Sequence, residues 1–150
     1  MSDMTTPRIP QWVVPAALGA LVVILGAVAL IRGGGDPDPA TPEGALRLYL
    51  EGIASGDFEQ AYRFLDPQGF QGCDPEDIEQ NAGFVDAFTA LHRETRMRDG
   101  TATIVMDIRF DGGFIGFPNE MEFQMVERDG FWYVTGDPWP YFSWSCRRGN

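Results

Sequence analysis

Few side chains in this sequence are of the types that carry out chemistry. His92 is the single histidine and the one side chain expected to titrate near neutral pH. It stands where a helical pattern changes into a strand pattern, which favours a solvated or hydrogen-bonded residue. The acidic run from Asp74 to Glu79 lacks the alternating oxygen ligands of a calcium loop and is typical of a helix start. We therefore predict no metal site and no cofactor.

The two cysteines, Cys73 and Cys146, are far apart in the chain and form no Cys-x-x-Cys redox pair. We predict that they form a structural disulfide that ties the chain end to the helices. Closing a loop of this length contributes roughly 4 kcal/mol on a chain-entropy estimate. Two buried free thiols are the alternative.

Composition limits the elements that can position these side chains. The chain has 150 residues, of which 44% are hydrophobic, enough for one modest domain with a core. It carries 11 basic against 22 acidic residues, and the net charge of −11 argues against nucleic acid as a partner. Every basic residue is arginine, which excludes lysine Schiff-base chemistry and lysine-dependent phosphate loops.

Residues 12–31 form an uncharged apolar run of 20 residues between Arg8 and Arg32. A helix of that length spans about 30 Å, the thickness of a bilayer core. We predict a single transmembrane helix that follows a cytoplasmic tail, residues 1–11. A signal peptide cleaved near Ala27-Val28-Ala29, which would release a secreted domain, is the alternative.

A Gly/Pro spacer, residues 32–42, follows the apolar run and is expected to be flexible. The folded domain is then residues 43–150. We place this domain outside the cytoplasm, on the outer side of the cell membrane, because its two cysteines suit an oxidising compartment.

The first half of the domain has helical periodicity. Thr41 can cap a helix that Gly56 ends, and Asp57 can cap a second helix directly after it. A third helix is predicted to begin at Asp74 and to continue through Phe88.

The second half alternates with a period of two and predicts about four antiparallel strands. Asp99-Gly100 and Asp129-Gly130 are hairpin signals. Strict alternation gives the first strand two faces. One face comprises Leu91, Arg93, Thr95 and Met97, and the other comprises His92, Glu94, Arg96 and Arg98. Helices followed by hairpins indicate an α+β fold in which two or three helices pack on a curved antiparallel sheet.

Three segments carry a resemblance to a known family: YLEGIASGD at 49–57, AYRFL at 61–65 and RDGFWYV at 128–134. Together they resemble the nuclear transport factor 2-like, or cystatin-like, superfamily. The resemblance implies a cone-shaped sheet around a cavity, which some members use for catalysis and many for binding or assembly.

The catalytic members of that superfamily use a carboxylate base and a hydrogen-bond donor in an apolar cavity. Asp107 and Tyr133 have these side-chain types, but the alternation turns Asp107 away from the face of Ile104 and Ile108. We therefore name no catalytic residue, and an isomerase, cyclase or dehydratase is the alternative function.

Aromatic side chains gather in the stretch 138–144 and in the Gly-rich connection 111–119. They either pack over the sheet or form a surface that contacts a ligand or partner. The predicted cavity or partner surface comprises Tyr49, Phe114, Phe117, Trp132, Trp139, Tyr141 and Trp144. The leading hypothesis is a membrane-anchored, non-enzymatic module that binds a protein partner or a small apolar ligand, with a homodimer as a further arrangement.

Overall fold

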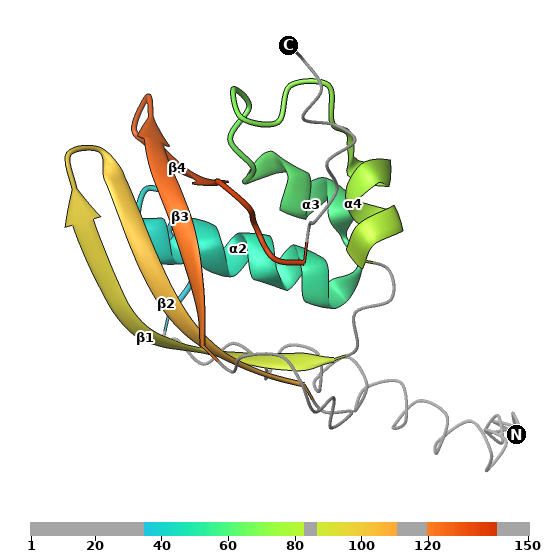
Figure 1. Ribbon diagram of the computed structural model, residues 1–150, viewed down its shortest axis with the longest axis horizontal. Helices are drawn as coiled ribbons and strands as arrows, with labels where there is room; N and C mark the ends of the chain where they lie inside the picture. The colour runs from blue at the N-terminus through green and yellow to red at the C-terminus, as the bar shows by residue number, and fades with distance from the viewer. Residues whose placement is uncertain (1–34, 83–86, 111–119, 141–150) are drawn as a thin grey trace, which may run out of the picture.

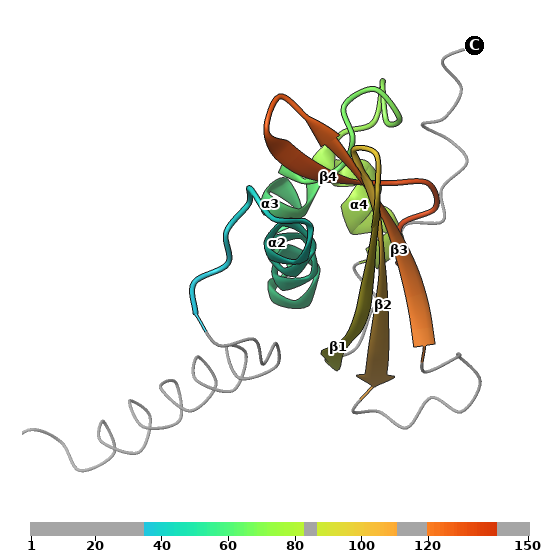
Figure 2. The same ribbon diagram turned by 90° about the vertical axis from the view of Figure 1, so that its left-hand side faces the viewer.

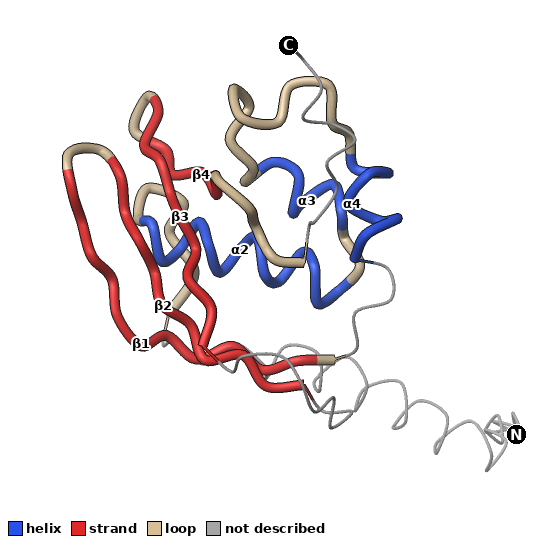
Figure 3. The backbone as a smooth tube through the Cα atoms, in the orientation of Figure 1, coloured by secondary structure: helices blue, strands red, loops and turns tan. Residues whose placement is uncertain are grey.

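The structure is a computed structural model that describes residues 35–82, 87–110 and 120–140. Within these ranges three helices precede four strands (Figures 1 and 3). The helices are α2 (Pro42–Ser55), α3 (Phe58–Arg63) and α4 (Pro75–Ala82). The strands are β1 (Phe88–Arg98), β2 (Thr101–Phe110), β3 (Glu120–Arg128) and β4 (Phe131–Thr135), which form one antiparallel sheet in that order. The predicted α+β class, with three helices and four strands, is confirmed.

Local caps begin the first two helices and end α2 as predicted. The Thr41 hydroxyl accepts a hydrogen bond from the Gly44 N–H at 3.1 Å, and Gly56 ends α2 in the left-handed conformation. Asp57 Oδ1 accepts from the Gln60 N–H at 3.0 Å. Each bond satisfies an N–H that lacks a helical partner, so each helix begins where the sequence predicts.

Helix α4 is shorter than predicted, because it ends at Ala82 and Phe88 belongs to β1. Phe88 pairs with Phe110 of β2, and its ring lies 5.1 Å from that of Trp139, centroid to centroid. Pairing and packing with residues distant in sequence decide the conformation of Phe88, which helical spacing alone assigns wrongly.

The strand β1 contains an irregularity that the alternation does not predict. His92 pairs with Met106 and Glu94 pairs with Val105, so Arg93 is the extra residue of a β-bulge. Before the bulge Leu91 pairs with Asp107, and beyond it Thr95 pairs with Ile104, which lies on the opposite face of β2 from Asp107. The predicted shared face of Leu91, Arg93, Thr95 and Met97 is therefore wrong, because one inserted residue reverses the alternation.

The two predicted hairpin turns are confirmed. Asp99 and Gly100 have φ values of 40° and 73°, and Asp129 and Gly130 have 53° and 82°. Positive φ at both central residues matches the twist of the paired strands, which explains the Asp-Gly sequences.

The sheet has two unlike faces, and α2 and α3 lie on the same side of it (Figure 2). The core face is apolar and includes Ile104, Ile108, Phe123 and Val134, which are at most 1% exposed. We call the other side the open face, because no described helix covers it. Its residues on β1 to β3 include Thr89, Leu91, Glu94, Arg96, Thr103, Val105, Asp107, Arg109, Glu120, Glu122 and Gln124.

The end of the predicted spacer packs against the domain. Asp38 O accepts from the Thr41 N–H at 3.0 Å, and Pro39 O accepts from the Trp132 N–H at 3.4 Å. Gly44 faces Asp38 so closely that an added Cβ would lie 2.0 Å from the Asp38 carbonyl oxygen. The last residues of the spacer therefore belong to the folded unit.

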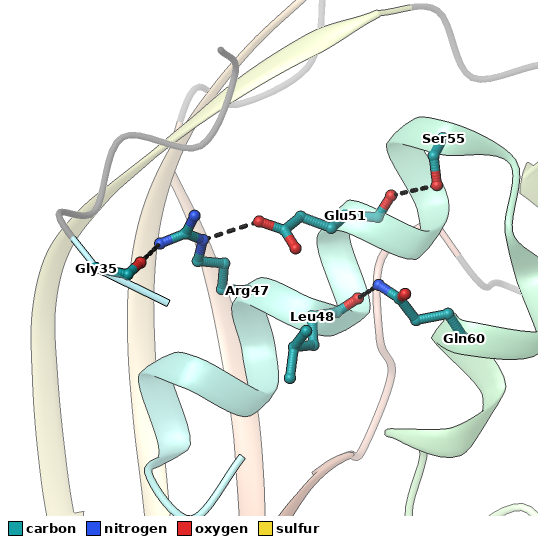
Figure 4. Close-up of polar contacts among 6 residues, drawn as sticks. All are labelled: Gly35, Arg47, Leu48, Glu51, Ser55 and Gln60. Carbon is teal, nitrogen blue, oxygen red and sulfur yellow. Dashed lines mark hydrogen bonds and ion pairs between the residues drawn. The ribbon is translucent and has the colours of Figure 1, made fainter. Parts of the chain in front are cut away.

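Two further contacts connect α2 to its surroundings, as Figure 4 shows. Arg47 donates to the Gly35 carbonyl at 2.9 Å and pairs with Glu51 one turn along the helix at 2.8 Å. The Gln60 amide of α3 donates to the Leu48 carbonyl at 2.9 Å.

Candidate functional site

A buried carboxylate lies on the open face of the sheet. The Asp107 side chain is only 8% exposed, and its Oδ2 accepts from Arg93 at 2.7 Å and from Arg109 at 3.1 Å. The two arginine side chains are 55% and 62% exposed. Glu120 lies directly across from Asp107 on β3. These four residues, Arg93, Asp107, Arg109 and Glu120, line a pocket of about 450 Å³ and are called the Asp107 site below.

Local chain geometry assembles this site from three strands. Arg93 enters it through the bulge of β1, while Arg109 follows Asp107 by two residues and therefore shares its face. Glu120 begins β3, and its pairing with Asp107 sets it on the same face. The site thus depends on strand register as much as on residue type.

The two guanidinium groups hold Asp107 ionised. Hydrogen bonds from Arg93 first, and from Arg109 second, lower the pKa of this carboxyl, against the opposing effect of burial. A general base that works near neutral pH needs a raised pKa, so Asp107 has the opposite tuning.

One oxygen of Asp107 is left without a partner. Oδ1 is buried from solvent, and no described residue donates a hydrogen bond to it. A buried polar atom without a partner is costly, so the site has an incomplete hydrogen-bond network.

A second buried carboxylate, Asp66, is fully paired. Arg128 donates to both of its oxygens, from Nε to Oδ1 at 2.7 Å and from a terminal nitrogen to Oδ2 at 2.9 Å. The Gln68 N–H also donates to Oδ1 at 3.1 Å, and the Thr135 hydroxyl lies 3.5 Å from Oδ2. The Arg128 bonds chiefly lower the pKa of Asp66 and in turn raise the pKa of Arg128.

Asp66 connects the helices to the sheet. Its N–H donates to the Val134 carbonyl at 2.9 Å, and the Val134 N–H donates to the Phe64 carbonyl at 2.7 Å, so the chain after α3 runs along β4. A smaller pocket of about 270 Å³ lies beside it and is lined by Tyr62, Arg63, Leu65, Asp66, Pro67, Phe70 and Tyr133. Because Asp66 joins two layers of the fold, we assign it a structural role.

Three of the residues predicted to form a cavity or partner surface lie in the hydrophobic core. Tyr49, Trp132 and Trp139 are 0%, 4% and 8% exposed. The Tyr49 hydroxyl donates to the Trp139 carbonyl at 3.2 Å, and the Trp139 ring contacts Phe88 and Phe110. These three side chains pack the interior and present no surface. Phe114, Phe117, Tyr141 and Trp144 lie outside the described residues.

The structure bears on one half of the predicted disulfide. Cys73 is 6% exposed and disulfide-bonded, and no cysteine among the described residues is free. Cys146 lies outside the described residues, so the Cys73–Cys146 pairing stays a prediction. The Tyr62 hydroxyl donates to the Cys73 carbonyl at 2.8 Å and holds this part of the chain against α3.

The remaining chemical candidates have local partners. His92 Nε2 lies 2.8 Å from the Thr95 hydroxyl. Asp74 and Asp77 exchange hydrogen bonds between side chain and backbone at 3.0 Å, the reciprocal pattern of a helix start. Within the described ranges no group of three His, Cys, Asp or Glu side chains could hold a metal ion.

Sequence reasoning did not single out Arg93, Arg109, Glu120 or the Asp66–Arg128 pair. Arg109 could have been found, because a charge two residues from Asp107 on one strand shares its face. The bulge that positions Arg93 and the pairing that positions Glu120 leave no comparable local signal.

Comparisons with known proteins give one structural match. No family model matches the chain, and no curated protein matches it. The solution structure of a SEC-C motif containing protein from Rhodopseudomonas palustris matches with 22% identity and a TM-score of 0.46. The match covers 66% of this chain and 78% of that one. A likeness of this degree supports no inference about function.

This finding corrects the resemblance to the nuclear transport factor 2-like, or cystatin-like, superfamily. The matching structure is described as a SEC-C motif protein, and no comparison returns the nuclear transport factor 2-like family. The assignment is therefore withdrawn, together with the cone-shaped cavity that it implied. Its segments mark a helix junction and a hairpin, local features that many α+β folds share.

Among the residues that the structure describes, no helix is long and apolar enough to cross a membrane. The predicted span, residues 12–31, lies outside them, so the membrane anchor stays a prediction.

Proposed function

We propose that this chain is a membrane-anchored, non-enzymatic binding module whose domain binds its partner through the open face of the sheet. The observation that carries this proposal is the Asp107 site, where a buried carboxylate with one unpaired oxygen lies in a pocket on that face. Arg93 and Arg109 each direct one nitrogen to Asp107 Oδ2 and keep further N–H donors for a partner that supplies acceptors.

The packing of the interior supports recognition at the surface. Large side chains fill the space between the helices and the core face, among them Tyr49, Phe88 and Phe123, each at most 1% exposed. The lowered pKa of Asp107 favours binding over proton abstraction in the alternative enzyme.

The anchor and its side of the membrane rest on the sequence. Residues 12–31 are long enough to span a bilayer, and a disulfide at Cys73 suits an oxidising compartment. Because Arg47 binds the Gly35 carbonyl, only residues 32–34 separate the end of the span from the domain. Four extended residue steps reach at most about 14 Å, so the module works close to the membrane surface.

Site-specific photocrosslinking in intact cells tests the open face. The photoreactive substitution Gln124→p-benzoylphenylalanine lies on that face, and the same substitution at Glu59 of α3 is the matched control. Both native side chains are exposed, and benzophenone inserts into C–H bonds of proteins and polysaccharides alike. We expect a discrete product from position 124 and none from position 59. Equal products at both positions, or none at position 124, would contradict the proposal.

A further inference from the structure

We propose that the Asp107 site binds an uncharged polyhydroxylated ligand, a saccharide, through hydroxyl groups that donate to the Glu120 carboxylate and accept from Arg93 and Arg109. This inference rests on the proposed function, because it names the chemistry that the open face recognises. It follows from the unused donors and acceptors of the site, its charge balance and its size.

The site holds unused donors and acceptors side by side. A guanidinium carries five N–H donors, and Arg93 and Arg109 each direct one terminal nitrogen to Asp107 Oδ2. The structure shows no other hydrogen bond from either side chain to a described residue. Asp107 Oδ1 has no donor but is buried from solvent. The exposed Glu120 carboxylate, which accepts no hydrogen bond from a described residue, is the acceptor that a ligand can reach. A ligand that fits must therefore donate and accept at once.

The charge balance of the site favours an uncharged ligand. Two arginines face two carboxylates, so the formal charges cancel. An anion drawn to Arg93 and Arg109 meets Asp107 and Glu120, and a cation drawn to the carboxylates meets the arginines. A hydroxyl group carries one donor and two lone pairs, and its hydrogen bonds to charged side chains are stronger than those to neutral groups.

The size of the site indicates several hydroxyl groups on one molecule. A pocket of about 450 Å³ is in the range of small-molecule sites and exceeds the volume of one protruding side chain. The lining residues come from three neighbouring strands about 4.8 Å apart, so their polar atoms reach a ligand at several points. Hydroxyls distributed around a sugar ring meet this requirement, whereas a single amide or hydroxyl side chain does not.

Ligand-observed NMR on the full-length chain tests the inference. The protein is held in a detergent without a sugar headgroup, and the probes are glucose, N-acetylglucosamine and cellobiose at millimolar concentrations. Inorganic phosphate and ethylammonium are the charged comparison probes. We expect at least one sugar to bind and neither charged probe to bind. No sugar binding, or tighter binding of a charged probe, would overturn the inference.

Variants locate the binding within the molecule. Arg109→Gln and Glu120→Gln should each weaken sugar binding at least about tenfold, the loss of one hydrogen bond to a charged group. Asp107→Asn should weaken sugar binding because it removes the charge that positions Arg93 and Arg109. Arg96→Gln is the matched control, because Arg96 lies on the same face but pairs with Glu94 and Glu122. Three independent variants keep the test valid if one of them fails to fold. Equal sugar binding by these variants and the control would refute the site.

The two proposals fail in different ways. A crosslinked product at position 124 without sugar binding refutes the saccharide and leaves the open face as the binding surface. Absence of the crosslinked product contradicts the binding face itself.

Discussion

The two buried aspartates of this protein are similarly buried but differ in the hydrogen bonding of their carboxylate oxygens. As whole residues, Asp66 and Asp107 are 3% and 5% exposed, and arginine pairing lowers the pKa of each. Arg128 donates hydrogen bonds to both oxygens of Asp66, whereas Arg93 and Arg109 both donate to a single oxygen of Asp107. The other oxygen of Asp107 has no partner. A closed network stabilises a fold, and an incomplete one keeps hydrogen-bonding capacity for a ligand.

The largest difference should appear when each carboxylate is neutralised. We expect Asp66→Asn to lower the free energy of unfolding by about 2 kcal/mol, because it leaves Arg128 without its charged acceptor. For a domain of this size the melting temperature falls by roughly 10 °C. Thermal unfolding of the full-length chain in detergent micelles measures the change. Asp107→Asn is the control and should cost less, since exposed arginines are its partners. A larger loss of unfolding free energy for Asp107→Asn than for Asp66→Asn would contradict this comparison.

Acid should affect stability in part through Asp66. Its pKa in the folded chain lies below the ordinary value, about 3.9, which it regains on unfolding. The contribution of its charge is therefore complete above about pH 4 and is lost as the pH falls through the folded pKa. We expect unfolding experiments between about pH 5 and pH 2 to show a smaller loss for Asp66→Asn than for the unmodified chain. Parallel losses in the two proteins would show that Asp66 carries no such contribution.

Salt should change the pKa values of the two aspartates to different extents, a smaller effect than the two above. Arg93 and Arg109 are more than half exposed, whereas the Arg128 side chain is 30% exposed. Salt at about 1 M shortens the screening length to about 3 Å and acts mainly on exposed charges. We expect NMR titration to show that salt raises the pKa of Asp107 further toward its ordinary value than that of Asp66. An equal rise for both groups would contradict the difference in exposure.

The smallest effect concerns the edge of the Asp66 network. The Thr135 hydroxyl lies 3.5 Å from Asp66 Oδ2, at the limit of a hydrogen bond. We expect Thr135→Val to change the free energy of unfolding by about 0.5 kcal/mol, measured by urea denaturation. A change as large as that of Asp66→Asn would mean that the hydroxyl, and not Arg128, holds the carboxylate.

Local signals predicted the helices and hairpins well. Thr41, Gly56 and Asp57 act on backbone groups within four residues, and the Asp-Gly turns depend on their own φ values. Phe88 was assigned to a helix wrongly and the bulge at Arg93 was not predicted, because both depend on pairing with another strand. The resemblance failed for a related reason, since it rested on local segments that do not specify how elements pack.

One can read from the sequence alone the α+β class, the caps and turns, the uncharged run of residues 12–31 and the excess of acidic residues. These properties follow from composition, periodicity and contacts between near neighbours. Three features become visible only in the folded chain: Asp66 closes a hydrogen-bond network, Asp107 keeps an unpaired oxygen, and Tyr49, Trp132 and Trp139 fill the core. Strand register and the packing of distant segments set those contacts, and no local pattern encodes them.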